Sequence, residues 1–114
     1  MHDCLFCKIV KGDIPSTIVY RDDQVTAFRD INPAAPTHIL IVPNKHIDSV
    51  NVLTAGDEPL IGHLFTTAKH LAAQEKIEQG GYRLIMNTNA DAGQTVFHIH
   101  LHLLGGAPLK YPMG

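Results

Sequence analysis

An alternating run of histidine and apolar residues, His98–Leu104, constrains the fold of this chain more than any other segment. Successive side chains of a β-strand point to opposite faces, so the isoleucine and leucines are predicted to face a core while three imidazoles line the other face. A rise of about 3.3 Å per residue would space these rings roughly 6.5 to 7 Å apart. A merely solvated face would favour Thr, Lys, Glu or Ser, because three adjacent rings repel one another when charged. The run therefore predicts a strand whose polar face carries chemistry.

The other elements are predicted from apolar spacing and turn residues. A short helix is expected over residues 4–10, with Asp3 as its N-cap and Gly12 as its stop. Strands are expected over 14–20, 24–29, 38–42, 82–87 and 96–104. A long helix should begin at 54–57 and continue to about Gln79, where Gly80 and Gly81 end it. Its predicted inner stripe is Leu60, Ile61, Leu64, Ala68, Leu71 and Ala72. One long helix cannot alternate with every strand, which favours an α+β fold with an antiparallel sheet.

Composition limits the class of protein and its partners. The 114 residues, 45% apolar and 18% charged, predict a single folded domain over 1–114 that can also bury surface against a partner. Nine Lys and Arg against 11 Asp and Glu give a net charge of -2, and no basic stripe is present, so nucleic acid is a poor candidate partner. The sequence contains neither an apolar run of about 18 residues nor a signal-peptide pattern, which predicts a cytoplasmic protein with no membrane partner.

The histidine run allows two kinds of chemistry. Paired His-x-His side chains on a strand can hold zinc and activate water. Alternatively, one neutral imidazole attacks an electrophile while its neighbours supply protons and orientation. His100 is the candidate nucleophile, because it alone has a histidine on either side of it.

The surroundings of the run narrow the choice of electrophile. Between residues 84 and 109 there is no Lys or Arg, and Asp91 is the only carboxylate. This argues against a Walker-type site or a two-metal phosphatase, which need a lysine or several carboxylates. The turn at 91–95 can instead offer backbone N–H groups and the Thr95 hydroxyl to one phosphoryl oxygen.

Further motifs accompany the run along most of the chain: Phe6–Ile9, Ala27–Ile31, Ala35–His38, Gly81–Arg83, Gly93–Gln94 and Gly105–Gly106. Together with His98–Leu104, they resemble the nucleotide-binding branch of the histidine-triad (HIT) superfamily. The resemblance implies a five-stranded antiparallel sheet with one long and one short helix, and a homodimer that joins two such sheets. It also implies a purine-nucleotide cleft and hydrolysis of the P–N bond of adenosine monophosphate-type phosphoramidates through a covalent nucleotidyl-histidine.

The same resemblance implies roles for individual residues. His100 would be the nucleophile, His38 and His98 would support and orient it, and His102 would contact the phosphate and help to protonate the leaving amine. Asp30 would accept hydrogen bonds from the ribose hydroxyls. The base pocket would be formed by Phe6, Ile9, Phe28 and Ile31, and the phosphate side by Asn87, Gly93, Gln94 and Thr95. Imidazolium rings beside the nucleophile would act as the proton donors.

The two cysteines, Cys4 and Cys7, are too few for a disulfide framework, so metal ligation, redox chemistry and simple burial remain open from spacing alone. Resemblance to zinc-bearing members of the superfamily implies a structural zinc held by Cys4, Cys7, His46 and His98, and not required for the chemistry.

Two alternative functions remain at this point. One is a zinc-dependent hydrolase that uses the triad itself as ligands, and the other is a non-catalytic nucleotide-binding scaffold. Tyr111, near the C-terminal end of the sequence, is a candidate for shaping the leaving-group preference. His63 and His70 share one face of the long helix and are predicted to be solvated and without function.

Overall fold

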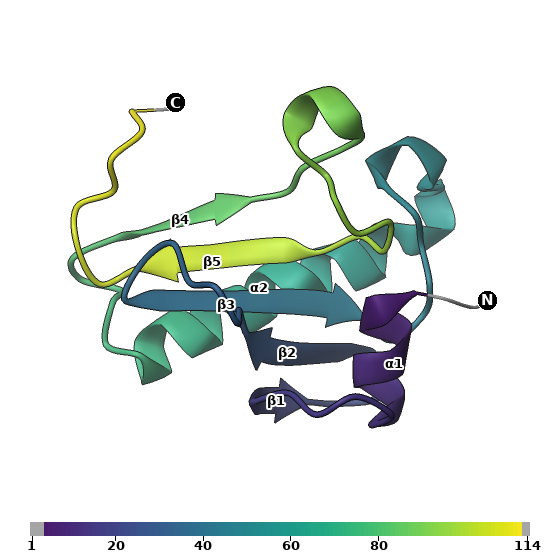
Figure 1. Cartoon of the computed structure of the whole chain (residues 1–114), viewed down its shortest axis with the longest axis horizontal. Helices are drawn as coiled ribbons and strands as arrows, with labels where there is room; N and C mark the ends of the chain where they lie inside the picture. Colours follow the sequence, from purple (N-terminus) through teal and green to yellow (C-terminus); the bar gives the residue numbers. More distant parts are fainter. Residues whose placement is uncertain (1–3, 113–114) are drawn as a thin grey trace.

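The computed structural model describes residues 4–112, which form an antiparallel sheet, two α-helices and three short 3₁₀ turns. The strands are β1 (Ile18–Arg21), β2 (Val25–Arg29), β3 (Thr37–Pro43), β4 (Tyr82–Ile85) and β5 (Leu101–Gly105). The helices are α1 (Leu5–Lys11) and α2 (Glu58–Gln74), and the 3₁₀ turns are η1 (Val50–Val52), η2 (Ala55–Asp57) and η3 (Ala90–Ala92). Figure 1 shows the strand order β1-β2-β3-β5-β4, with α2 behind the sheet and α1 at one end of it. The predicted α+β fold with five antiparallel strands is confirmed.

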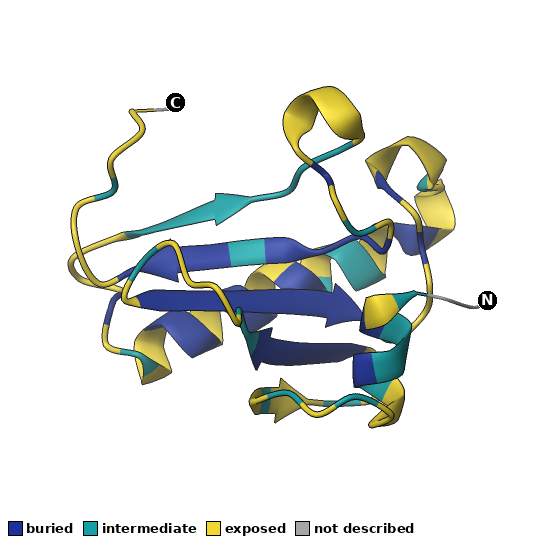
Figure 2. Cartoon of the chain, viewed as in Figure 1, coloured by how far each residue is buried: buried dark blue, intermediate teal, exposed yellow. Residues whose placement is uncertain are grey.

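The central strand β3 is buried along its whole length (Figure 2), because each face of the sheet has its own hydrophobic core. The core under α2 contains Ile39, Ile41, Leu101, Leu103 and the helix residues Leu64, Ala68, Leu71 and Ala72. The core on the opposite face contains Leu40, Val42, Phe28, Phe6 and Ile9. Antiparallel pairing places Leu40 opposite His102 and His38 opposite Leu104, so both histidines belong to the face covered by α1. The predicted alternation therefore holds within β5, where His102 is the only imidazole.

The short helix α1 begins one residue later than expected and is capped differently. Its N-cap is Cys4, whose sulfur accepts a hydrogen bond from the Cys7 amide at 3.3 Å. The predicted N-cap, Asp3, lies outside the described residues. Gly12 ends the helix with a φ of 85°, a left-handed conformation that glycine adopts without strain.

The long helix α2 ends at Gln74, five residues before the predicted stop. Lys76 takes a φ of 61°, and the Ile77 amide bonds back to the carbonyl of Ala72 at 3.0 Å. Ile77 is 6% exposed and packs in the core under α2, yet it does not lie on the apolar stripe of a continued helix. Burial of this side chain therefore ends the helix, and Gly80 and Gly81 only complete the connection to β4.

The strand that carries the histidine run begins at Leu101 and not at the predicted Val96. The ladder between β3 and β5 stops at the pair Ile41–Leu101, although β3 itself continues to Pro43, and β4 ends at Ile85 opposite His102. The amide of Ile99 instead donates to the carbonyl of Ile47 at 2.7 Å. His98 and His100 consequently precede the strand, and only His102 lies on it.

His63 is not simply solvated. Its Nε2 donates to Asp22 Oδ2 at 2.7 Å, and the same oxygen accepts the Tyr20 hydroxyl at 2.7 Å. The prediction of a shared solvated face is therefore wrong for His63, which ties α2 to the β1–β2 turn, whereas His70 is exposed. Among the helices of residues 4–112, none is long and apolar enough to cross a membrane.

Candidate functional site

A pocket of about 400 Å³ lies over the α1 face of the sheet, between α1, the end of β2 and the segment that precedes β5. Eight residues predicted for the site line it: Phe6, Ile9, Phe28, Asp30, Ile31, Thr95, His100 and His102. Phe6, Ile9 and Phe28 are at most 7% exposed and also belong to the core, whereas Ile31 is 90% exposed at the end of β2. The pocket therefore has an apolar part next to two imidazoles and one carboxylate. Such a lining suits an aromatic ring joined to a polar, reactive group.

His100 is held by its own chain. Its Nδ1 lies 2.8 Å from the carbonyl oxygen of His98, and a carbonyl can only accept, so Nδ1 carries the proton. In the neutral ring Nε2 then carries the lone pair. The ring also contacts Phe6 edge-on at a centroid distance of 5.0 Å and His102 at 4.9 Å. This arrangement presents a neutral imidazole that can act as a nucleophile.

A chain of hydrogen bonds likewise sets the proton positions on His38 and His102. The amide of Ala34 donates to His38 Nδ1 at 3.0 Å, which leaves the proton of a neutral His38 on Nε2. That Nε2 lies 2.9 Å from His102 Nδ1 and 3.5 Å from Asp30 Oδ2. His102 Nδ1 therefore accepts, and its Nε2 carries the proton. His102 can thus donate from Nε2–H, while the lone pair of His100 Nε2 can form a bond to an electrophile.

Burial lowers the pKa of His38, His100 and His102 below that of a free imidazole, because the charged ring loses its water. For His102 the rings of His100 and His38 add to burial, and its pKa falls to about 4. For His100, the bond to the His98 carbonyl and the Asp30 carboxylate oppose the effect of burial on the pKa without cancelling it. Burial therefore favours the neutral form of the three rings in the free protein, in contrast to the imidazolium donors that the resemblance implies. The available proton is that of a neutral N–H.

The predicted phosphate-side residues divide into two groups. Thr95 is exposed and lines the pocket. Asn87 and Gln94 are used within the protein, since Asn87 Nδ2 donates to the Ala92 carbonyl at 2.8 Å and Gln94 is only 4% exposed. Gly93 has a φ of 85° and ends η3. These three residues shape the loop that precedes the pocket, and none of them lines it.

His98 points to a different cluster from that of His100. Its Nδ1 lies 3.3 Å from Cys4 Sγ and 3.5 Å from Cys7 Sγ, and Cys7 Sγ lies 3.3 Å from His46 Nδ1. The four predicted ligand atoms all lie within 4.8 Å of one another. His98 Nε2 donates to the Pro43 carbonyl at 2.7 Å, which leaves Nδ1 unprotonated for a metal. The side chains form a group that can hold a metal ion.

A second group that can hold a metal ion consists of Asp30, His38 and His102. The triad histidines themselves belong to different groups, because His98 joins the cysteines and His102 joins Asp30. Within residues 4–112 no group of ligands combines His98, His100 and His102. The structure thus gives no support to a metal held by the triad alone.

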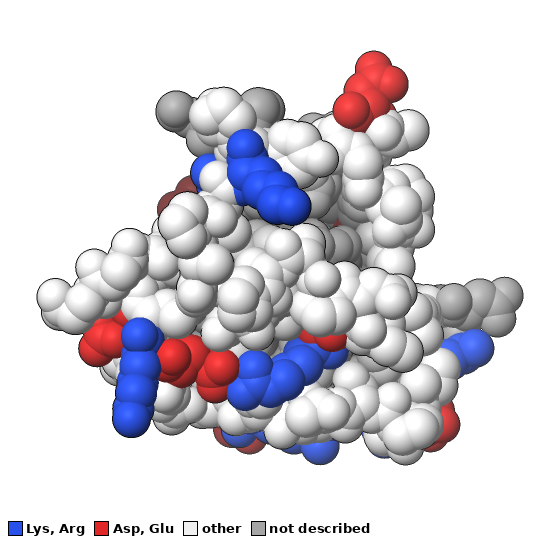
Figure 3. Space-filling model, turned by 60° about the vertical axis from the view of Figure 1, so that its left-hand side comes forward, with Lys and Arg blue, Asp and Glu red and all other residues white. Residues whose placement is uncertain are grey.

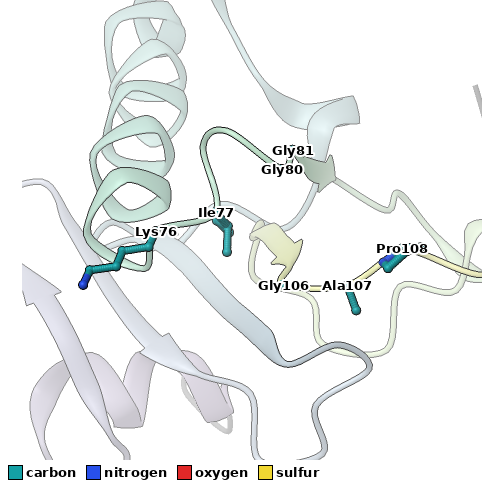
Figure 4. Close-up of a pocket in the computed structure, with 7 residues that line it drawn as sticks. All are labelled: Lys76, Ile77, Gly80, Gly81, Gly106, Ala107 and Pro108. Carbon is teal, nitrogen blue, oxygen red and sulfur yellow. The ribbon is translucent and has the colours of Figure 1, made fainter.

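Another cavity, of about 460 Å³, lies between the end of α2 and Gly106–Pro108. Figure 4 shows that its lining is mostly glycine and apolar side chains, and that the ammonium of Lys76 extends away from the other labelled residues. It is lined by no histidine, cysteine or carboxylate. The cavity near His100 is therefore the candidate active site.

Several residues of the site were not found from the sequence. Leu40 and Val96 line the pocket, and Ser16 adds a hydroxyl. Leu40 could have been assigned from its alternation with His38 on one strand. The Ala34 amide and Asp48, whose Oδ1 lies 2.6 Å from His46 Nε2, have no local sequence signal, because their contacts depend on loops.

Comparison with known proteins agrees with this geometry. Residues 11–109 match the model of the HIT domain. The chain is 58% identical over 108 residues to the purine nucleoside phosphoramidase of Escherichia coli (strain K12), with 95% of this chain and 91% of that protein covered. Its structure is similar to that of a HIT family hydrolase from Legionella pneumophila Philadelphia 1, with a TM-score of 0.95 and 50% identity over 98% of this chain and all of that one. A HIT family hydrolase from Clostridium thermocellum also has a TM-score of 0.95, with 44% identity over 99% and 98% of the two chains. The chain therefore belongs to the HIT domain family.

Proposed function

We propose that this protein is a phosphoramidase that cleaves the P–N bond of purine nucleoside phosphoramidates, with His100 as the nucleophile. The observation that carries the proposal is the bond from His100 Nδ1 to the His98 carbonyl, which leaves an unprotonated Nε2 on a ring that lines the pocket. The Escherichia coli relative at 58% identity is a purine nucleoside phosphoramidase, which supports the same reaction.

The proposed reaction has two steps. His100 Nε2 forms a bond to phosphorus, the P–N bond to the amine breaks, and the leaving nitrogen takes the Nε2 proton of His102, which a proton from solvent replaces so that the ring stays neutral. Water then attacks phosphorus, its proton returns to solvent, and the bond to His100 breaks. His38 acts through His102, because its Nε2–H fixes which nitrogen of that ring holds the proton. Each well-placed proton transfer contributes about 10² to 10⁴ in rate.

Ligand recognition in this proposal uses the rest of the pocket. The purine would lie against Phe6, Ile9, Phe28 and Ile31, and the Asp30 carboxylate would accept hydrogen bonds from the ribose. Thr95 would bind a phosphoryl oxygen through its hydroxyl, while Asn87, Gly93 and Gln94 would act by shaping the loop.

The experiment that tests the proposal compares His100→Asn with wild type on an adenosine 5′-phosphoramidate that releases a fluorescent amine. We expect turnover to fall at least about 1,000-fold, with AMP still bound within threefold, and intact-mass analysis of wild type should trap a nucleotidyl adduct on His100. The matched control is His70→Asn, at an exposed position of α2. A His100→Asn enzyme that retains more than about a tenth of the wild-type rate would contradict the nucleophile assignment.

The same assay tests the two alternatives. A zinc-dependent hydrolase would lose its activity when a chelator removes the metal, whereas the covalent mechanism survives this treatment. A nucleotide-binding scaffold would bind AMP and show no turnover of the phosphoramidate. His98 and His102 belong to different groups of possible metal ligands, which favours the covalent mechanism over a metal held by the triad.

We also propose a structural zinc at Cys4, Cys7, His46 and His98. A tetrahedral zinc with bonds of about 2.3 Å to sulfur and about 2.0–2.1 Å to nitrogen spaces its S and N ligands by about 3.6 Å. The observed S···N distances of 3.3 to 3.5 Å fit this spacing. The Nε2 atoms of His46 and His98, which point away from the sulfurs, bond to Asp48 and to the Pro43 carbonyl. When bound, zinc would link α1 to the segment before β5. Metal analysis of untagged protein should find zinc, and less than about one zinc per two chains would refute the site.

A homodimer is proposed as well. The edge strand β4 is half-buried and has one unpaired side (Figure 2), and large apolar side chains are exposed at Val50, Val52, Phe65 and Phe97. Sedimentation equilibrium should give twice the chain mass, and a monomer at micromolar concentration would contradict the dimer.

Tyr111, 76% exposed, is proposed to shape the leaving-group preference.

The proposed partner is a purine nucleoside monophosphate-type molecule and not a nucleic acid. On the face drawn in Figure 3, basic and acidic side chains alternate in a band and much of the remaining surface is uncharged. A phosphate backbone requires a continuous basic surface. Cytoplasmic location stays a prediction.

A further inference from the structure

Residues 46–48 connect the cysteine–histidine cluster (Cys4, Cys7, His46 and His98) to the loop beside the pocket. The side chain of Asp48 is 62% exposed, and its Oδ1 lies 2.6 Å from His46 Nε2. A carboxylate that accepts from the second nitrogen of a ligating histidine orients the ring and fixes its proton. His46 Nδ1 is thereby directed to Cys7 Sγ, 3.3 Å away. Asp48 is a further contributor to the cysteine–histidine cluster, although it supplies no ligand atom to it.

The main chain of the same segment holds the loop beside the pocket. The Asp48 carbonyl accepts from Gln94 Nε2 at 2.7 Å, and Gln94 Oε1 accepts from the Asn89 amide at 2.7 Å. Gln94 Nε2 also donates to the carbonyl of Val96 at 3.1 Å. The loop therefore depends on the position of Asp48, and it supplies Thr95 and Val96 to the wall of the pocket.

We propose that Asp48 is a positioning residue that transmits occupation of the cysteine–histidine cluster to the wall of the nucleotide pocket. Its carboxylate holds His46 and its carbonyl holds Gln94, so a metal that fixes His46 also fixes the loop. The inference rests on the proposed zinc site, and its consequence for ligand affinity rests on the proposed nucleotide site. Coupling between two sites is reciprocal, so zinc and nucleotide must raise each other's affinity by the same factor. Loop ordering by the first ligand lowers the entropic cost of binding the second.

The first measurement is zinc affinity, by competition with a chromophoric chelator. The variants are Asp48→Ala, which removes the acceptor, and Asp48→Asn, which keeps an acceptor and removes the charge. The control is Glu78→Gln, which removes one exposed acidic charge between α2 and β4, at the opposite end of the sheet. We expect Asp48→Ala to weaken zinc binding about 10-fold or more and Asp48→Asn to lie between it and wild type. An affinity of Asp48→Ala within twofold of the control overturns the proposal.

The second measurement is hydrogen exchange of the Asn89 and Gln94 amides with no zinc and with one equivalent. One equivalent of zinc is expected to fill the four-ligand cluster, with its two cysteines, before the three-ligand group at Asp30. Zinc should slow exchange about fivefold in wild type and in Glu78→Gln, and less than twofold in zinc-saturated Asp48→Ala. The AMP dissociation constant of wild type should fall by a similar factor on zinc loading.

The outcomes separate this inference from the proposed function. If zinc leaves the exchange of the loop unchanged, or does not bind, the role of Asp48 is refuted while phosphoramidase turnover still stands or falls by its own assay. If zinc slows exchange but AMP does not bind, the role of Asp48 stands and the proposed nucleotide site fails. If zinc slows amide exchange equally in Asp48→Ala and in wild type, the role of Asp48 is also refuted. Because Asp48 is largely exposed, its variants are expected to fold, which circular dichroism checks.

Discussion

Substitution of Asp22 by Asn should destabilise the protein in a way that disappears in acid. Asp22 Oδ1 accepts from the amides of Gln24 and Val25, and Oδ2 accepts from Tyr20 and His63. Asn preserves the first two bonds, but its Nδ2 cannot accept, so the Tyr20 hydroxyl and the His63 ring both lose their charged acceptor. The side chains of Asp22 and His63 are 27% and 30% exposed, so each lost charge-assisted bond is discounted to about 1–1.5 kcal/mol. The predicted cost at pH 7 is therefore about 2–3 kcal/mol, or a fall of roughly 10 °C in melting temperature.

The pH dependence follows from the carboxyl. Burial alone would raise the pKa of Asp22, but the hydrogen bonds from His63, Tyr20 and the two amides outweigh it and hold the pKa well below its usual range. A carboxyl with a depressed pKa stabilises the fold above the unfolded value of about 3.9, and this contribution is lost as pH falls toward the folded value. The difference in unfolding free energy between wild type and Asp22→Asn should thus shrink below about pH 4, where the carboxyl of wild type becomes protonated.

Urea denaturation at several pH values, followed by circular dichroism, measures this difference directly. The control is Asp23→Asn, at the neighbouring exposed position of the same turn, which should cost less than about 0.5 kcal/mol. A cost for Asp22→Asn below about 0.5 kcal/mol at pH 7, or one that stays constant down to pH 2.5, would show that the hydrogen bonds to Asp22 do not stabilise the fold.

Three further substitutions test other contacts. Thr67→Val should stabilise the protein by roughly 1 kcal/mol, because the Thr67 hydroxyl is buried and has no partner among the described residues; a lower melting temperature would reveal an unrecognised hydrogen bond. His38→Ala should lower kcat about 100-fold or more on the phosphoramidate substrate, since His102 loses the donor that fixes its proton, and an unchanged kcat would exclude this relay. Ile31→Ser should weaken AMP binding several-fold in calorimetry without changing the melting temperature, because Ile31 is 90% exposed yet lines the pocket; unchanged affinity would remove Ile31 from the base site.

Local patterns predicted the parts of the fold that depend on side-chain alternation. Ile39 and Ile41 lie on the α2 face with Leu101 and Leu103, as the alternation requires. The end of α2 could not be predicted, because the burial of Ile77 competes with helix propensity and depends on the position of the sheet. The start of β5 could not be predicted either, since the amide of Ile99 bonds to the carbonyl of Ile47, a contact with a distant loop that takes the place of pairing with β3.

The candidate site was likewise predictable from the sequence only in part. The residue types and spacing of the histidine run predicted His100 as the reactive ring, and the HIT resemblance supplied the residues proposed for the base pocket. The loop contacts of Asn87 and Gln94 could not be predicted, because their side-chain amides bond to loop carbonyls and an amide that no local pattern brings near them.

Sequence alone determined which side chains of β3 and β5 share a face, because a strand alternates with a fixed period and an imidazole keeps its chemistry in any context. Only the tertiary structure decided which nitrogen of each ring holds its proton and which histidine joins the cysteines. Those properties depend on carbonyls and amides delivered by distant loops, such as the Pro43 carbonyl at His98 and the Ala34 amide at His38.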